Sequence, residues 1–437
     1  MPFIEPKVLK GFRDFLPSSE MLRLNLIEKI ETSLRSFGFM PIDTPALEYA
    51  EILLGKGGGE TEKQIYRFKD NGERDIALRF DLTVPFARFS AQHYSELIFP
   101  FKRYHIGKVW RGENSQRGRY REFIQCDFDI IGSGSPAADF EILLMIHHTL
   151  SNLGAGEISI KINHRGLFNR FLSHIGLEEK SADILRAVDK ISKAGLDETK
   201  QAVSEIAGEI KGQKIIDFIF TETTFDETLE RITELSGGPS IESERLKLIK
   251  RFMDDASISN FTLTPSITRG LDYYTGIVFE TFLTELPEIG SICSGGRYDN
   301  LAGLYSKNSI SGVGTSIGLD RMIAALESLK RLPPVVGFCI TGIACLREEK
   351  SGLYQALSDQ FRYRGIPCEV FLEPCDLKQM SKQFILAEKK GLRWMVIPGE
   401  NPLCDPLTLR NLASRKNYEG ISLEETVKII TTHPLLS

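Results

Sequence analysis

Two neighbouring stretches of the chain alternate between apolar and polar residues, which is the pattern of half-buried β-strands. They cover residues 104–110 and 120–129, with a break from Gly112 to Gly118. This spacing predicts two antiparallel strands joined by a loop. The second strand alternates polar with apolar side chains: Gln125, Cys126, Asp127, Phe128, Asp129 and Ile130. Polar side chains along one face of a central strand predict a pocket.

The segment before this hairpin combines a predicted helix with extended chain. Apolar residues recur at helical spacing over residues 22–37, and Gly38 is placed to end the helix in a left-handed cap. The extended segment Phe39–Glu48 contains two prolines, so we expect it at a sheet edge or an interface. Residues 76–80 alternate as a strand that ends at Asp81.

The middle of the chain changes from sheet to helix and back. Residues 138–153 have the pattern of a helix. From Arg165 to about Asp255, helical patterns alternate with glycine-containing turns, which predicts a helical insertion. Strand character returns at Phe261, and a small-residue strand over residues 311–318 leads into a helix that begins near Arg321.

The C-terminal quarter alternates between strand and helix patterns after a proline-containing linker at Leu332–Val335. The predicted strands are Val336–Thr341, Pro367–Leu372 and Arg393–Pro398. The predicted helices between them are Glu349–Tyr363 and Leu377–Lys390. This alternation predicts an α/β domain with a mostly parallel sheet.

Length, composition and charge narrow the class of protein. At 437 residues the chain has room for about three domains, and 42% hydrophobic with 26% charged residues is ordinary for a soluble protein. A net charge of −5 argues against a general nucleic-acid coat but permits one basic site. Because no apolar run has the length of a signal-peptide core or a membrane helix, we expect a cytoplasmic protein without membrane contact. The seven cysteines include no CxxC pair, which favours reduced, buried thiols over disulfides or a zinc site.

The loop between the two alternating strands is rich in charge. Arginine occupies positions 111, 117, 119 and 121, with Glu113 and Glu122 among them. Guanidinium groups pair bidentately with phosphate and stack on flat rings, so polyanion binding is one interpretation. A solvated, salt-bridged hairpin is the other, because exposed charge runs are usually surface.

Other candidate residues have a structural as well as a functional interpretation. Asp81 and Thr83 at a strand end suit a pocket for an ammonium group, but both also favour a helix cap, and the two roles are compatible. Gly55–Thr61 has the wrong spacing for a phosphate-binding loop and is interpreted as a mobile loop. The adjacent His147 and His148 point to different faces and cannot chelate one metal together.

Several segments resemble the motifs of class II aminoacyl-tRNA synthetases, and in particular the histidyl-tRNA synthetase family. Residues 111–113 and 118–123 are similar to motif 2, and residues 311–321 resemble motif 3. The run RGLDYYTG from Arg269 and the run CSGGRYDNL from Cys293 resemble the two histidine-specific motifs of the family.

The resemblance covers nearly the whole chain and implies a fold. It implies an α+β catalytic domain built on an antiparallel sheet in residues 1–325, with a helical insertion at about 168–255 that reaches toward the tRNA acceptor arm. A linker at 326–336 and a C-terminal α/β anticodon-binding domain at 337–437 follow. The helix and strand that lead to Pro45 are similar to motif 1, which forms the dimer contact in the family, so a homodimer is implied.

The implied activity is that of a histidine–tRNA ligase. The carboxylate of L-histidine attacks the α-phosphate of ATP, pyrophosphate leaves, and the terminal ribose 3′-hydroxyl of tRNA(His) then takes the histidyl group. Mg²⁺ is implied at the outer phosphates, and no protein ligand for it is identified. Because the first step needs little proton chemistry, we expect catalysis by positioning and charge neutralisation.

The resemblance also implies a role for individual residues. Arg111 and Arg269 are the implied catalytic cations at the α-phosphate. The residues implied to bind histidine are Asp81, Thr83, Arg111, Gln125, Asp129, Arg269, Tyr273, Tyr274 and Tyr298. The residues implied to bind ATP are Arg111, Glu113, Phe123, which stacks on adenine, and Arg321. The residues expected to meet the acceptor end of tRNA are Gln116 and Arg119.

Two other functions and one structural alternative are considered beside this interpretation. Regulatory paralogues bind histidine as subunits of ATP phosphoribosyltransferase. They lack the C-terminal domain and usually do not keep the arginine motif, whereas this chain has the C-terminal domain and the arginine motif. Prolyl and threonyl synthetases share motifs 1 to 3 but would not carry RGLDYYTG. In structural terms, Arg269 is also placed to form a salt bridge with Asp272.

Overall fold

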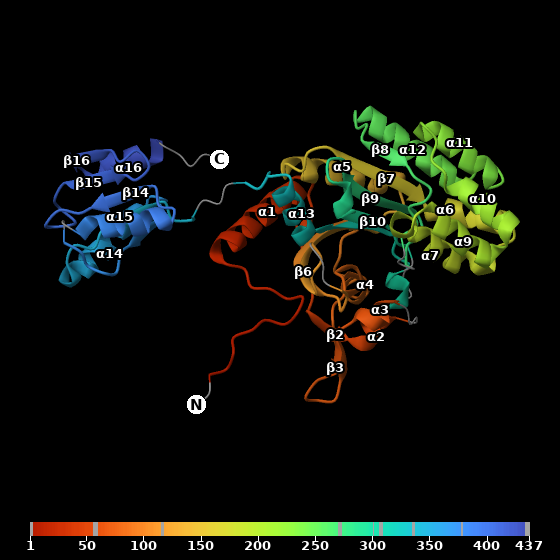
Figure 1. Ribbon diagram of the computed structural model, residues 1–437, viewed down its shortest axis with the longest axis horizontal. Helices are drawn as coiled ribbons and strands as arrows, with labels where there is room; N and C mark the ends of the chain where they lie inside the picture. Colours follow the sequence, from red (N-terminus) through yellow and green to blue (C-terminus); the bar gives the residue numbers. More distant parts are fainter. Residues whose placement is uncertain are drawn as a thin grey trace. The chain divides into compact units, whose positions relative to one another are not determined.

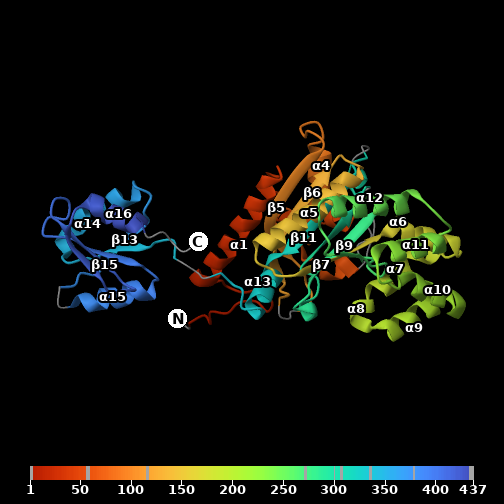
Figure 2. The same cartoon turned by 90° about the horizontal axis from the view of Figure 1, so that it is seen from above.

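The computed structural model describes residues 3–55, 60–114, 118–269, 273–299, 301–305, 309–333, 337–376 and 379–432. The chain divides into two compact units, Met1–Phe15 with Arg23–Leu332 and Leu16–Leu22 with Pro333–Ser437. Figures 1 and 2 show the helices and strands of each unit.

The first unit is built on an eight-stranded sheet with the order β1-β5-β6-β11-β10-β9-β7-β8. Among the described strands, β1 pairs with β5 and β7 with β8 in parallel, and the other pairs of this sheet are antiparallel. The strands are β1 (Met40–Pro41), β5 (Phe101–Trp110), β6 (Glu122–Ile131), β7 (Ile158–His164), β8 (Phe261–Leu263), β9 (Ile277–Leu283), β10 (Cys293–Arg297) and β11 (Gly312–Gly318). The antiparallel hairpin and the sheet-edge position of the proline-containing segment are therefore confirmed.

The apolar face of this sheet is covered by helices. Because side chains alternate along a strand, Cys126, Phe128 and Ile130 of β6 all point to that face and are buried. The covering helices are α1 (Pro17–Ser36), α5 (Pro136–Asn152) and α13 (Leu319–Ser328). Helices α5 and α13 pack on β6 (Figure 1), and α1 reaches β5 through Arg35 Nε, which donates to the hydroxyl of Tyr104 at 3.1 Å.

The polar face of the sheet is covered by shorter elements. They are α4 (Thr83–Gln92), α2 (Ala50–Leu54), α3 (Glu60–Gln64) and a three-stranded sheet of β2 (Leu47–Tyr49), β4 (Asp75–Leu78) and β3 (Arg67–Lys69). Phe86 of α4 belongs to one apolar cluster with Tyr274 and Tyr298. The predicted loop Gly55–Thr61 is shorter than expected, since α3 begins at Glu60 and residues 56–59 lie outside the described residues.

The helical insertion lies at one end of the sheet (Figure 1). Its elements are α6 (Arg165–His174), η1 (Glu178–Lys180), α7 (Ser181–Asp189), α8 (Ile191–Ala194), α9 (Leu196–Ala207), α10 (Glu209–Ile219), α11 (Phe225–Leu235) and α12 (Ile241–Asp255). Phe171 stacks on Phe218 with ring centroids 4.2 Å apart, and α12 packs on α5. Among the described residues of this unit, two further 3-10 turns occur, η2 (Pro287–Ile289) and η3 (Ala302–Leu304).

The second unit has a five-stranded sheet, which is mixed and not mostly parallel as expected. In the order β13-β12-β14-β15-β16, β12 pairs in parallel with β13 and β14, whereas β15 and β16 are antiparallel. The elements are β12 (Thr341–Ile343), η4 (Glu348–Lys350), α14 (Ser351–Arg362), β13 (Cys368–Val370), α15 (Met380–Lys389), β14 (Trp394–Ile397), β15 (Leu407–Asn411), β16 (Asn417–Ile421) and α16 (Leu423–Thr432). Figure 2 shows α15 on the opposite face of the sheet from α14 and α16.

Two details of the second unit correct the prediction. The stretch 398–406 is too short for the crossover that a parallel neighbour of β14 requires, so the chain returns antiparallel. Strand β12 begins at Thr341, where the predicted strand Val336–Thr341 was expected to end.

The cysteines were expected to be reduced and buried, and the helices were expected not to span a membrane. All seven cysteines are free, and Cys404 is exposed, although buried thiols were expected. In the described part of the chain, no helix is both long and apolar enough to cross a membrane.

Candidate active site

The polar face of β6 forms the floor of the candidate site. Gln125, Asp127 and Asp129 are buried on this face, as the alternating pattern predicted. Strand β11 lies beside them and places Gly314 opposite Asp129. A methyl group at Gly314 would lie 1.8 Å from Asp129 Oδ1, so glycine is required there for the carboxylate to keep its place.

A buried arginine, Arg103, supplies positive charge to this floor. Its side chain is fully buried on β5, and Nη2 lies 2.7 Å from Asp129 Oδ2. The guanidinium also stacks 4.0 Å from the ring centroid of Phe86. We did not predict Arg103, because the strand was expected to begin at Tyr104. Extending the alternation back by two residues from His105 would have placed Arg103 on the polar face.

Three tyrosines enclose the end of the floor at Asp129. The hydroxyl of Tyr298 donates to Asp129 Oδ1 at 2.5 Å. The ring of Tyr273 lies 4.7 Å from that of Tyr274 and 6.3 Å, edge to face, from that of Tyr298. The structure therefore brings the predicted residues of the histidine-specific motifs together with Asp129.

Asp81 caps a helix and is buried near Arg103 and Arg111. Its Oδ1 accepts hydrogen bonds from the backbone N–H groups of Thr83 at 3.2 Å and Val84 at 3.0 Å, at the start of α4. Burial raises the pKa of Asp81, while these hydrogen bonds and the charge of Arg111 oppose the rise. The helix-cap interpretation is therefore confirmed, and the pocket for an ammonium group stays a prediction.

Arg111 is held between two aromatic rings at the other end of the floor. Its guanidinium lies 4.4 Å from the ring centroid of Phe80 and 5.2 Å from that of Phe123. Its Nε donates to the carbonyl oxygen of Phe80 at 3.1 Å. A guanidinium fixed in this way is preorganised for an anion.

Arg321 and the charged loop form a second basic group. Arg321 Nη1 donates to the carbonyl oxygen of Ser291 at 2.5 Å, and burial with the nearby Arg119 charge lowers the pKa of Arg321 to about 10. Arg119 Nη1 lies 3.7 Å from Glu113 Oε2. Gln116 lies outside the described residues.

Arg269 forms an ion pair with Glu280, which we did not predict as its partner. Its Nη1 donates to Glu280 Oε1 of β9 at 2.8 Å, and its guanidinium lies 5.9 Å from the ring centroid of Tyr274. Its Nε is buried without a hydrogen-bond partner among the described residues. The alternative partner Asp272 lies outside them.

Asp320 on α13 contacts both the N-terminal segment and the charged hairpin, and we did not predict this residue from the sequence. Asp320 Oδ2 accepts from the backbone N–H of Ile124 at 2.9 Å, and Arg13 forms an ion pair with Asp320 Oδ1. Arg13 also lies 3.7 Å from the ring centroid of Tyr120. The only signal in the sequence was the position of Asp320 beside Arg321.

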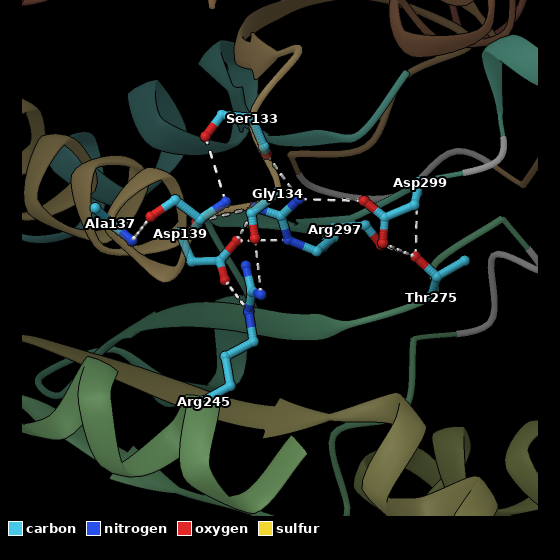
Figure 3. Close-up of polar contacts among 9 residues, drawn as sticks. Ser133, Gly134, Ala137, Asp139, Arg245, Thr275, Arg297 and Asp299 are labelled. Atoms are coloured by element: carbon cyan, nitrogen blue, oxygen red, sulfur yellow. Dashed lines mark hydrogen bonds and ion pairs between the residues drawn. The ribbon is translucent and has the colours of Figure 1, made fainter. Parts of the chain in front are cut away.

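A buried ion network lies beside the loops that carry two of the tyrosines, and Figure 3 shows the residues of this network. Asp139 of α5 holds Arg297 of β10, with Nη2 to Oδ1 at 2.7 Å, and Arg245 of α12, with Nε to Oδ2 at 2.6 Å. Arg297 Nη1 also donates to Asp299 Oδ1 at 3.1 Å, and the Thr275 hydroxyl donates to Asp299 Oδ2 at 2.9 Å. Thr275 and Asp299 directly follow two tyrosines of the site, so this network joins the insertion to both of their loops.

The donor set of the described residues does not form a metal cage. No group of three or more histidine, cysteine, aspartate or glutamate side chains in this part of the chain is arranged to hold a metal ion. A Mg²⁺ ion that keeps its waters and binds phosphate oxygens needs no such cage.

Comparisons with known proteins agree with this geometry. The sequence profile of the family described as "Histidyl-tRNA synthetase" matches residues 11–322. The histidine–tRNA ligase of Treponema denticola is 52% identical over 90% of this chain and 88% of its own length. That of Treponema pallidum is 49% identical over 95% of both chains. The crystal structure of histidyl-tRNA synthetase from Nostoc sp. PCC 7120 superposes with a TM-score of 0.85 at 30% identity, covering 99% of this chain and 100% of that one.

Proposed function

Because this chain belongs to the histidyl-tRNA synthetase family, we propose that the two ends of its polar floor bind histidine and ATP and hold them in place for reaction. Its activity is that of a histidine–tRNA ligase, whose substrates are histidine, ATP and tRNA. The observation that carries the proposal is the single floor of β6, with acidic residues at the tyrosine end and Arg111 at the other.

Histidine binds at the acidic end of the floor. Asp81, Thr83 and Gln125 take the ammonium group, because carboxylate, hydroxyl and amide oxygens accept its hydrogen bonds. Asp129 receives an imidazole N–H, and its place is fixed by Tyr298 and Arg103. The rings of Tyr273 and Tyr274 close the pocket around the substrate.

ATP binds at the basic end. Phe123 stacks on adenine, Arg321 lies along the nucleotide, and Glu113 orients it through the charged loop. Arg111 and Arg269 neutralise the α-phosphate as the substrate carboxylate attacks it and pyrophosphate leaves. Magnesium, when bound to the outer phosphates, neutralises charge on the leaving group.

The second step involves the larger partner. The ribose 3′-hydroxyl of tRNA(His) attacks the carbonyl of the adenylate, and AMP leaves. We assign Gln116 and Arg119 to the acceptor end, the insertion at about 168–255 to the acceptor arm, and the domain at 337–437 to the anticodon. The catalytic domain spans 1–325. We also propose that the enzyme is a cytoplasmic homodimer, with a contact through the helix and strand before Pro45.

Arg269→Ala tests the catalytic assignment. Charge develops on the α-phosphate only as the reaction proceeds, so loss of a fixed cation there should reduce pyrophosphate exchange by roughly 10² to 10³. Arg269→Lys should rescue only in part, because a point charge does not reproduce the planar fork.

A matched control separates catalysis from stability. Arg331 forms a half-exposed ion pair with Glu285, so Arg331→Ala should keep its exchange rate. Melting temperature is measured on the same preparations. An Arg269→Ala variant that loses melting temperature but keeps its rate per folded molecule would reduce Arg269 to a structural partner of Glu280.

A further inference from the structure

Asp127 is a buried carboxylate of the floor that the proposed roles leave unused. It lies on β6 between Gln125 and Asp129, on the same face, and its side chain is almost fully buried. Within the described residues, Asp127 Oδ1 has no hydrogen-bond partner, and neither has the neighbouring Gln125 Oε1. Buried acceptors of this kind are destabilising unless a donor reaches them.

The protein groups around Asp127 satisfy it only in part. The hydroxyl of Ser316 on β11 hydrogen-bonds to Asp127, and Gln125 Nε2 donates to Ser316 Oγ at 2.9 Å. This bond turns the amide oxygen of Gln125 away from Ser316. The buried cation Arg103 gives its ion pair to Asp129, at 2.7 Å. Asp127 Oδ1 and Gln125 Oε1 are therefore two buried acceptors without a donor among the described residues.

Burial and the neighbouring charges determine the protonation of Asp127. Burial and the charge of Asp129 raise the pKa of Asp127 to about 7, although Arg103 opposes the rise. The charged and titratable groups that face Asp127 are Arg79, Asp81, Arg103, His105, Arg111 and Asp129. Burial also lowers the pKa of His105 to about 3, so His105 contributes no positive charge near neutral pH.

A primary ammonium group matches this arrangement. It carries three N–H donors and a positive charge, whereas a neutral imidazole offers one N–H. Two acceptors separated by one residue on a strand face lie close enough to share one ammonium group. We propose that Asp127 binds the α-ammonium group of histidine together with Gln125, and so determines which ligands enter the pocket. This inference rests on the proposed histidine site and adds a residue to it.

Binding of histidine should change the protonation of Asp127. Near pH 7 part of the free protein carries a proton on Asp127, and a bound ammonium group favours the ionised carboxylate. Binding of histidine therefore releases protons from Asp127. Imidazolepropionic acid has the same ring and carboxylate but lacks the amino group, so it should not displace this proton.

The experiment is titration calorimetry of the whole protein in two buffers with different heats of ionisation. Asp127→Asn should weaken histidine binding about 10- to 100-fold, as expected for a hydrogen bond to a charged group. Its binding of imidazolepropionic acid should change less than about threefold, because that ligand never uses Asp127. With histidine, Asp127→Asn should release fewer protons than the wild-type protein, and with imidazolepropionic acid the two proteins should release the same number, so that the protons of each ligand's own ring cancel.

Asp129→Asn is the matched control on the same strand face. It should weaken both ligands, since both carry the imidazole ring. Equal losses for both ligands in Asp127→Asn, or equal proton release with histidine by the wild-type protein and Asp127→Asn, would overturn the role of Asp127. If Asp127→Asn does not fold, Asp127→Glu, which keeps a carboxylate but moves it, gives the same comparison: histidine binding should weaken and binding of imidazolepropionic acid should not. A wild-type protein that binds neither ligand would instead refute the histidine site itself.

Discussion

The buried carboxylates of the floor differ in how closely each is paired, and this difference has consequences at single residues. Asp81, Asp127 and Asp129 are buried together, and among the described residues Arg103 forms its ion pair, at 2.7 Å, with Asp129. Buried charges of one sign raise the free energy of the folded state. A ligand with a positive charge relieves this cost, so the empty site is less stable than the occupied one.

Asp127→Asn should raise stability at high pH. The pKa of Asp127 is raised from 3.8 to about 7 in the folded protein, so the folded state holds this proton more tightly than the unfolded state, and stability falls as pH rises from about 4 through 7. Asparagine does not titrate. The variant should therefore be more stable than wild type at pH 8, by up to roughly 4 kcal/mol, and the gain should shrink at pH 5.

Urea unfolding at the two pH values measures this difference. Asp255→Asn, at an exposed position on α12, is the control and should change stability by less than about 0.5 kcal/mol at either pH. A gain for Asp127→Asn that is the same at pH 5 and pH 8 would contradict the burial of an ionised carboxylate.

At the scale of elements, strand β11 must have a glycine at position 314, because a side chain there would collide with Asp129. Gly314→Ala would place a methyl group 1.8 Å from Asp129 Oδ1 and 2.3 Å from its Cγ. Asp129 would have to leave Arg103 and Tyr298, so the KM for histidine should rise by roughly 10²-fold or more. Gly303→Ala is the control, since nothing among the described atoms lies within 4 Å of its added methyl group. Equal exchange kinetics for the two variants would show that the floor adapts.

The ion network at Asp139 joins elements from three parts of the chain, and Arg245→Gln tests it. Removing one arginine leaves a fully buried carboxylate with a lost partner, so unfolding free energy should fall by about 2 to 4 kcal/mol. The KM for histidine should also rise, because the tyrosine loops lose their anchor to the insertion. Arg251→Gln, an exposed position on the same helix, should be nearly neutral. Equal losses in both variants would make α12 itself the cause.

Local pattern predicted most elements, and its failures have physical causes. The alternation of β6 and the small residues of β11 were sufficient to predict two strands and a polar face, because burial of one face imposes a period of two. Arg103 was missed because its strand begins three residues before the clearest alternation. The partners of Arg103, Arg269 and Asp139 depend on strand order, which pairs distant segments and leaves no local signal.

At the scale of the whole molecule, the boundary at Leu332 and Pro333 allows the two units to be tested separately. A chain that ends at residue 332 retains every described residue assigned to histidine and ATP, so pyrophosphate exchange should continue. Aminoacylation should fall by roughly 10² or more, because a second contact with tRNA(His) is lost. A cooperative melting transition confirms that the shortened chain is folded. Full charging of tRNA by such a protein would remove the C-terminal unit from recognition.

The central pairing of β6 with β11 also affects how the chain is made. Asp129 pairs with Gly314, about 185 residues later, and the insertion is synthesised between them. At roughly 5 to 20 residues per second, the outer edge of β6 waits about 10 to 40 s on the ribosome for its partner. An uncovered strand edge recruits other strands, and inward-pointing charges discourage this. We therefore expect the buried charges of β6, Asp127 and Asp129, to discourage the nascent sheet from pairing with the wrong chain.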